Sequence, residues 1–149
     1  MSGNGRYSCA SCHRPDLAFT DGRPRAVGST GALLPRSAMS LVNAAYSRAF
    51  GWREPGTRSL EEQMRRPMFA EHPVELGLRH RRRQMLLEFG ADPALAREFS
   101  AAFPNSPGPV SMQHVIQAIA CFERSLVAGR SAFDRYVFCL LYTSDAADE

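Results

Sequence analysis

The chain has 149 residues, 44% of them hydrophobic, which is the size and composition of one globular domain with its own core. It has no run of about 18 apolar residues, so no membrane-spanning helix is expected. The formal net charge of +3 is unevenly spread: three acidic residues lie in the last five positions, and the residues before them carry 18 basic and 12 acidic side chains.

The pentapeptide Cys9-Ala10-Ser11-Cys12-His13 is the attachment signature of a c-type haem. Its two thiols lie one short turn apart, so they can add across the two vinyl groups of one porphyrin. The following imidazole can then supply an axial nitrogen ligand. We expect Cys9 and Cys12 to anchor a haem covalently and His13 to bind its iron.

Two other kinds of site share a Cys-x-x-Cys pair. A zinc site needs a second ligand pair, but Cys121 and Cys139 are too far apart in sequence to supply one. A thioredoxin-like dithiol should follow a strand, and none is predicted before Cys9. Both alternatives are therefore weaker than haem.

The residues after the motif predict a long irregular segment followed by helices. Turn-forming residues crowd positions 14–36, and such a loop is expected to wrap around the haem, with Leu17 and Phe19 packed against its face. Apolar spacing predicts a helix over 37–50. Ser59 and Glu62 form a capping box for a helix that should end before Pro67.

Four further helices are predicted toward the C-terminus, over residues 81–89, 93–103, 111–127 and 132–136. No segment alternates apolar and polar residues convincingly. The sequence therefore indicates an all-α domain.

Residues 79–83, Arg-His-Arg-Arg-Arg, form the densest basic cluster. They can be the solvated start of a helix, which we favour, or a docking patch for an acidic partner protein. Nucleic acid is not expected as a partner, because no aromatic or glycine pattern accompanies the arginines.

The two ends of the chain raise expectations of their own. Residues 139–149 continue no upstream pattern and are predicted to be a non-native tail, leaving 1–138 as the domain. The chain does not begin with a charged region followed by an apolar region, the pattern of a signal peptide, although covalent haem attachment normally follows export. We expect Met1 not to be the natural start, the domain to be incomplete at both ends, and the parent protein to be periplasmic.

The combined motifs resemble the di-haem cytochrome c peroxidase and MauG family, in its N-terminal cytochrome c-like haem domain. The resemblance spans residues 8–137, and the wording of residues 71–77 is closest to the MbnH-like branch, which oxidises tryptophan on a partner protein. It rests on the haem motif, Trp52, and the segments 19–22, 40–44, 59–63, 73–76 and 120–126.

The resemblance implies roles for five further residues. Glu75 matches the distal glutamate that moves a proton on bound hydrogen peroxide, although it could be a surface residue of its loop. Trp52 matches a tryptophan between the two haems, or is an ordinary core tryptophan. Gln63 and Pro67 match residues of the distal pocket, although Gln63 could be a helix-surface residue and Pro67 a residue that ends the helix. Asn43 matches a position near a calcium site.

The family resemblance implies an enzyme that reacts with hydrogen peroxide at this haem, with one haem c in this chain and two in the parent protein. Electrons would come from a small cytochrome or copper protein, or from a protein substrate. The alternative is a monohaem electron carrier without catalysis, with a methionine opposite His13.

Overall fold

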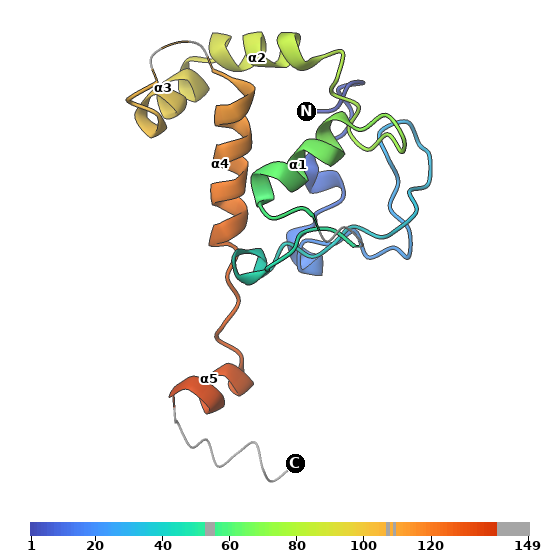
Figure 1. Ribbon diagram of the computed structural model, residues 1–149, viewed down its shortest axis with the longest axis vertical. Coiled ribbons are helices and arrows are strands. Elements are labelled where there is room, and N and C mark those ends of the chain that lie inside the picture. Colours follow the sequence, from blue (N-terminus) through green and yellow to red (C-terminus); the bar gives the residue numbers. More distant parts are fainter. Residues whose placement is uncertain (53–55, 107, 109, 140–149) are drawn as a thin grey trace.

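The computed structural model describes residues 1–52, 56–106, 108 and 110–139. Over these ranges the chain is helical and forms no β-strand, only three isolated bridges, so the predicted all-α class is confirmed (Figure 1). The helices are α1 (Leu60–Phe69), α2 (Arg82–Ala91), α3 (Pro93–Ala102), α4 (Met112–Ser125) and α5 (Ala132–Cys139), with 3₁₀ turns η1 (Cys9–Ser11), η2 (Pro15–Leu17) and η3 (Ala44–Tyr46).

Helix α4 is the longest of the described helices, and α1 packs beside it (Figure 1). The Ser111 hydroxyl caps α4 by accepting from the His114 N–H at 3.1 Å. One face of α4 is buried against the buried residues of α1, which recur every fourth position. The residues at this contact are Val115, Ile116 and Ala120 of α4, and Leu60, Met64 and Met68 of α1.

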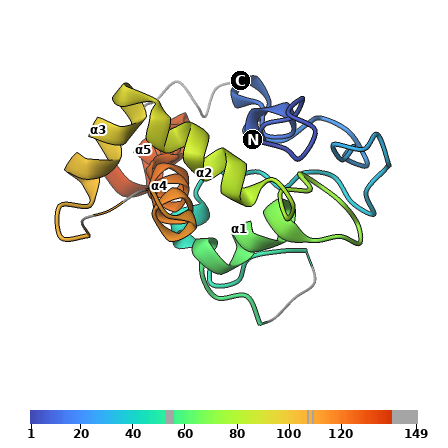
Figure 2. The same ribbon diagram turned by 90° about the horizontal axis from the view of Figure 1, so that it is seen from above.

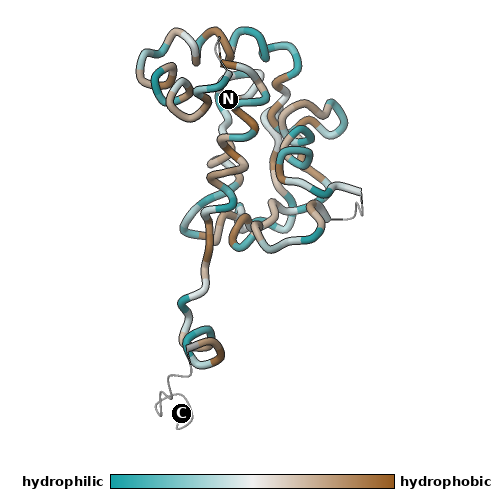
Figure 3. Tube along the Cα trace, turned by 60° about the vertical axis from the view of Figure 1, so that its left-hand side comes forward, coloured by the Kyte–Doolittle hydropathy of each residue, from teal (hydrophilic) through white to brown (hydrophobic). Residues whose placement is uncertain are grey.

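The other helices lie around this pair. Helices α2 and α3 contact each other beside one end of α4, and η3 contacts α4 near its other end (Figure 1). The irregular segment that follows the haem motif lies on the side of α1 away from α4 (Figures 1 and 2). Helix α5 lies away from the other helices, and Figure 3 shows hydrophobic residues on it. Its Phe133 and Phe138 are 70% and 77% exposed.

The helix predicted over 37–50 is wrong, since only the turn η3 forms there. Asn43 takes a left-handed conformation with φ of 60°, which interrupts any helix. The Ser40 hydroxyl donates to the Ala18 carbonyl and accepts from the Val42 N–H, so it also holds the backbone away from a helix.

The predicted end of the next helix is also wrong, because α1 continues through Pro67 to Phe69. Proline lacks an N–H, which costs α1 one hydrogen bond, but the Ala70 N–H still reaches the Arg66 carbonyl at 2.9 Å and closes the last turn. The carbonyl of Pro67 is then used outside the helix. The predicted helices at 81–89, 93–103, 111–127 and 132–136 are confirmed as α2 to α5.

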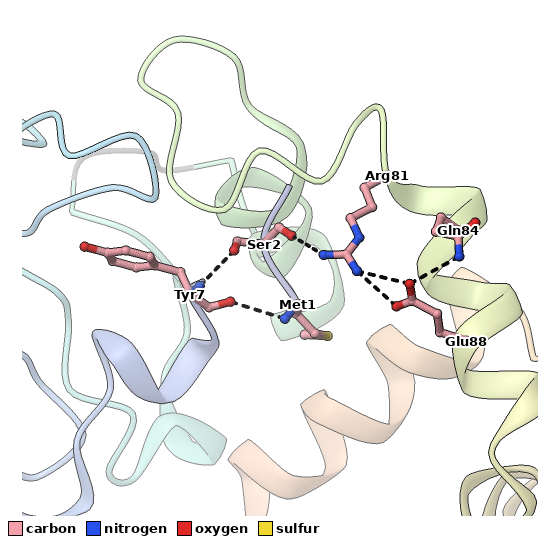
Figure 4. Close-up of polar contacts among 6 residues, drawn as sticks. All are labelled: Met1, Ser2, Tyr7, Arg81, Gln84 and Glu88. Carbon is pink, nitrogen blue, oxygen red and sulfur yellow. Dashed lines mark hydrogen bonds and ion pairs between the residues drawn. The ribbon is translucent and has the colours of Figure 1, made fainter. Parts of the chain in front are cut away.

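The segment before the haem motif is fastened to α2 (Figure 4). Arg81 donates to the carbonyl of buried Ser2 at 3.4 Å and to the Glu88 carboxylate at 3.0 Å. The Ser2 hydroxyl in turn accepts from the Tyr7 N–H at 2.9 Å. Arg81 therefore connects residues 1–8 with a helix that begins more than seventy residues later.

None of the described helices has the length and apolar character that crossing a bilayer requires. Residues 140–149 of the predicted non-native tail lie outside the described residues.

Candidate haem-binding site

A cavity of about 450 Å³ lies between the N-terminal segment, the irregular segments, α1 and α4. Its volume falls in the range of about 300–1,000 Å³ that small-molecule and cofactor sites occupy. Seven of the eight residues singled out from the sequence line it, and Asn43 does not. The seven are Cys9, Cys12, His13, Trp52, Gln63, Pro67 and Glu75.

The two cysteines face the cavity from a single tight turn. The N–H groups of Cys12 and His13 both donate to the Cys9 carbonyl, at 3.1 and 2.9 Å, which closes η1. Burial raises the pKa of both thiols above its ordinary value. A thiol that holds its proton this firmly is a weak redox nucleophile, so this environment does not favour a reactive dithiol.

A separate observation bears on the zinc alternative. Among the residues that the structure describes, no group of three or more His, Cys, Asp and Glu side chains comes together as a metal site.

His13 is oriented by a backbone carbonyl that the sequence did not reveal. Its Nδ1 lies 2.8 Å from the Phe19 oxygen, and since a carbonyl can only accept, Nδ1 carries the proton. The lone pair is therefore on Nε2, as an axial iron ligand requires.

The Phe19 carbonyl is placed by an unusual turn. Ala18 and Phe19 are both left-handed, with φ of 51° and 59°. The Phe19 ring lies edge-on against Phe122 of α4, with ring centroids 6.5 Å apart. Contrary to prediction, neither Leu17 nor Phe19 lines the cavity, which residues 26–28 and 34–42 line instead.

Glu75 lies on a loop that is tied to the end of α1. The Leu76 N–H donates to the Pro67 carbonyl at 2.9 Å, and the Leu78 N–H donates to the Met68 carbonyl at 2.8 Å. The Pro67 carbonyl thus accepts one of the hydrogen bonds that hold the loop against α1.

Two other segments hold the same loop. The Ser29 N–H donates to the Glu75 carbonyl at 2.7 Å, and the Gly3 N–H donates to the Leu76 carbonyl at 2.8 Å. Gly28 passes so close that a Cβ there would lie 2.2 Å from the Val74 oxygen. The position of Glu75 is therefore fixed by main-chain contacts from three directions.

Burial raises the pKa of the Glu75 carboxyl, and the positive charge of Arg66 partly opposes the rise. The raised pKa of Glu75 favours a carboxyl that can both hold and release a proton nearer to neutral pH.

Gln63 and Trp52 occupy different depths of the cavity. The Gln63 Oε1 atom is buried and has no hydrogen-bond partner among the described residues, so it is available to accept a hydrogen bond from a ligand in the cavity. Trp52 is 54% exposed, so it is a rim residue and not a core tryptophan. Its indole N–H donates to the Ser37 carbonyl at 3.0 Å.

Asn43 is engaged elsewhere. Its amide nitrogen donates to the Ala128 carbonyl and its amide oxygen accepts from the Ala128 N–H, both at 2.9 Å. Ligation of calcium by Asn43 stays a prediction, for which Oδ1 would have to use its second lone pair.

Glu123 of α4 also lines the cavity, although it was given no role from the sequence. Burial raises its pKa to about 7, and its negative charge helps to raise the pKa of Cys9. The neighbouring Arg124 points elsewhere, toward Glu61 of α1, with N–O distances of 2.7 and 2.9 Å. Only the packing of α4 distinguishes Glu123 from an ordinary helix-surface glutamate.

These features fit a covalently bound haem. Two thiols share one turn, an imidazole keeps its Nε2 lone pair, and a buried amide oxygen has no protein partner. A helical fold with this arrangement at the wall of a cavity defines the class of c-type haem domains.

Comparison with known proteins narrows the class. The profile of the family described as "Di-haem cytochrome c peroxidase" matches residues 1–138. The chain therefore belongs to the di-haem cytochrome c peroxidase family, as the resemblance predicted.

Individual relatives agree with this assignment. The methylamine utilization protein MauG of Methylorubrum extorquens is 37% identical over 137 residues, covering 91% of this chain and 37% of that protein. The cytochrome c551 peroxidase of Pseudomonas aeruginosa is 30% identical over 131 residues, covering 87% and 36%.

A solved structure agrees as well. A MauG-like protein associated with microbial copper homeostasis superposes with a TM-score of 0.87 at 40% identity, over 91% of this chain and 39% of that one. The chain thus spans less than two fifths of the length of these relatives, and its fold is the cytochrome c-like fold of a MauG-like protein.

Proposed function

We propose that residues 1–138 form the peroxide-reacting haem domain of a periplasmic di-haem peroxidase or oxidase. Cys9 and Cys12 would hold haem c through thioether bonds, and His13 would bind its iron through Nε2. The observation that supports this most directly is that these three residues and Glu75 line one cavity. When bound, the haem supplies the iron and the redox equivalents with which hydrogen peroxide reacts.

Glu75 is the residue that would move the proton. Its carboxylate would take a proton from one oxygen of hydrogen peroxide bound in the cavity and return it to the other oxygen, so that this oxygen could leave as water while the haem supplied the electrons. Burial of Glu75 supports this role, because a raised pKa brings proton uptake and release closer to neutral pH. The Gln63 amide would orient the peroxide, and the Pro67 ring would narrow the space available to it.

Trp52 would carry oxidising equivalents out of the cavity. Its ring lies on the rim, half exposed and held by the Ser37 carbonyl, where it can face both the cavity and a second redox group. In the complete protein we expect that group to be the second haem of the pair. The electrons would come from a small cytochrome, a copper protein or a side chain of a protein substrate, and calcium near Asn43 would bind between the haems.

The test is an absorption spectrum of the chain matured in a periplasm with haem-attachment machinery, before and after hydrogen peroxide. We expect a high-spin ferric spectrum that changes on addition of peroxide. In Glu75→Gln, which keeps the shape of the side chain, the change should slow by about 10²–10⁴-fold. Glu98→Gln, an exposed change on α3, should behave like the unaltered chain.

Two other outcomes contradict the proposal. A low-spin spectrum that ignores peroxide would favour the monohaem electron carrier. A chain without covalent haem would refute the roles of Cys9, Cys12 and His13.

A further inference from the structure

A second hollow, of about 470 Å³, lies at the start of α2. Four of its lining residues are basic: Arg79, His80, Arg82 and Arg83. Its floor is apolar and is made by Leu86, Leu87 and Val110. We call these seven residues the basic hollow.

The fold itself uses only part of the basic run at 79–83. Arg81 points away from the hollow and binds Ser2 and Glu88. Arg79 is paired with Glu71, and the His80 Nε2 lies 3.8 Å from the same carboxylate.

Arg82 and Arg83 differ from their neighbours. Both are exposed and have no ion pair with any residue that the structure describes. One acidic side chain, Glu71, therefore faces the basic side chains of the hollow, which leaves it cationic.

The apolar floor is also more open than the fold requires. Leu87 is 59% exposed, and the one buried residue of α2 is Met85. An open leucine beside unpaired arginines is a combination typical of protein interfaces, where arginine is enriched.

We infer that the basic hollow docks an acidic segment of a partner protein, with an apolar side chain entering the hollow and carboxylates pairing with Arg82 and Arg83. Charge complementarity selects an acidic partner. The concave shape selects a protein over a membrane, because a bilayer surface has no protruding side chain to fill a hollow. This inference goes beyond the proposed function and does not depend on a haem.

The probe is a fluorescein-labelled peptide of twelve residues, one leucine flanked by aspartates and glutamates, titrated with the full 149-residue chain at low salt. Anisotropy should show binding that weakens as salt is added. Replacing the peptide leucine by serine should weaken binding by about threefold to tenfold, because the apolar floor is then left uncovered.

Matched charge reversals distinguish binding at the basic hollow from electrostatic attraction to the chain as a whole. The double variant Arg82→Glu with Arg83→Glu should bind the peptide about tenfold more weakly or worse. Arg65→Glu with Arg97→Glu makes the same change of charge at exposed positions on α1 and α3 and should leave binding within about twofold. Circular dichroism checks that each variant is folded.

Two results would overturn the inference. Equal losses in both double variants would show attraction by net charge alone. Co-sedimentation with phosphatidylglycerol vesicles that requires Arg82 and Arg83, without peptide binding, would show a membrane-binding surface instead. Neither result bears on the haem cavity, so the proposed function is tested separately.

Discussion

Glu123 shows how a single carboxyl is changed by where its helix packs. In an unfolded chain its pKa would be near its ordinary value of 4.5, whereas burial against the cavity raises it to about 7. Desolvation has the largest effect on this pKa; Arg124 lowers it and Glu61 raises it. Between these two pH values the folded chain holds a proton that the unfolded chain has released.

The stability of the chain should therefore depend on pH through this residue. The contribution is complete below about pH 4.5 and is lost as the pH rises through about 7. We expect Glu123→Gln to reduce the fall in unfolding free energy between pH 4.5 and 8 by about 1–2 kcal/mol, allowing for the partial exposure of the carboxyl. Urea unfolding at both pH values measures it.

The control for this prediction is Glu98→Gln, which should keep the full fall. Some pH dependence should also survive in Glu123→Gln, because burial raises the pKa of Glu75 in the same direction. An unchanged fall in Glu123→Gln would show that its carboxyl is solvated at both pH values.

At the scale of elements, the loop that carries Glu75 is positioned by its neighbours and not by its own sequence. Its contacts are backbone hydrogen bonds to the end of α1, to the segment near Ser29 and to the N-terminal segment. Gly28 permits one of these approaches because it has no side chain. The position of Glu75 therefore depends on a residue whose contribution is the absence of a side chain.

Gly28→Ala tests this dependence. A Cβ 2.2 Å from the Val74 oxygen forces one of the two backbones to move, which should lower the unfolding free energy by about 1–3 kcal/mol. The response to peroxide should weaken with it, since Glu75 follows Val74. Chemical denaturation and the peroxide-dependent spectrum measure the two effects.

The matched control, Gly90→Ala, lies in α2 with nothing within 4 Å of the added Cβ. It should stabilise the chain by about 0.5–1 kcal/mol, because alanine is the better helix former. If Gly28→Ala changed the unfolding free energy no differently from Gly90→Ala, the loop would be shown to tolerate the added side chain.

At the scale of the whole molecule, the sequence predicted those features that depend on residues close together in the chain. Helices with their own caps, at Ser59, Asp92 and Ser111, begin where expected, and the haem motif places its two thiols on one turn. The helix prediction for residues 37–50 was wrong because Asn43 hydrogen-bonds to Ala128, eighty-five residues away. No pattern within the segment indicates that contact.

The same distinction applies to the site. The roles expected of Cys9, Cys12 and His13 follow from a contiguous motif, and the role expected of Glu75 follows from family resemblance. The Phe19 carbonyl and Glu123 were missed, because one depends on a left-handed turn and the other on which face of α4 meets the cavity.

The connection between the N-terminal segment and α2 can be tested directly. Arg81→Met keeps an unbranched apolar stem but removes the hydrogen bonds to Ser2 and Glu88. Amide exchange in residues 1–8 should become about twofold to fivefold faster, because one anchor of the segment is lost. Hydrogen–deuterium exchange measures it, and Arg82→Met, which has no such contacts, is the control.

The environment of Cys9 and Cys12 has a consequence for biosynthesis. In the folded chain both thiols are partly buried and hold their protons more tightly than free cysteine, so they are poor nucleophiles toward a vinyl group. The cavity walls come from segments spread over the whole chain, and these segments close around the thiols only on folding. If haem is attached here, we therefore expect the attachment machinery to reach the cysteines before the chain has folded around them.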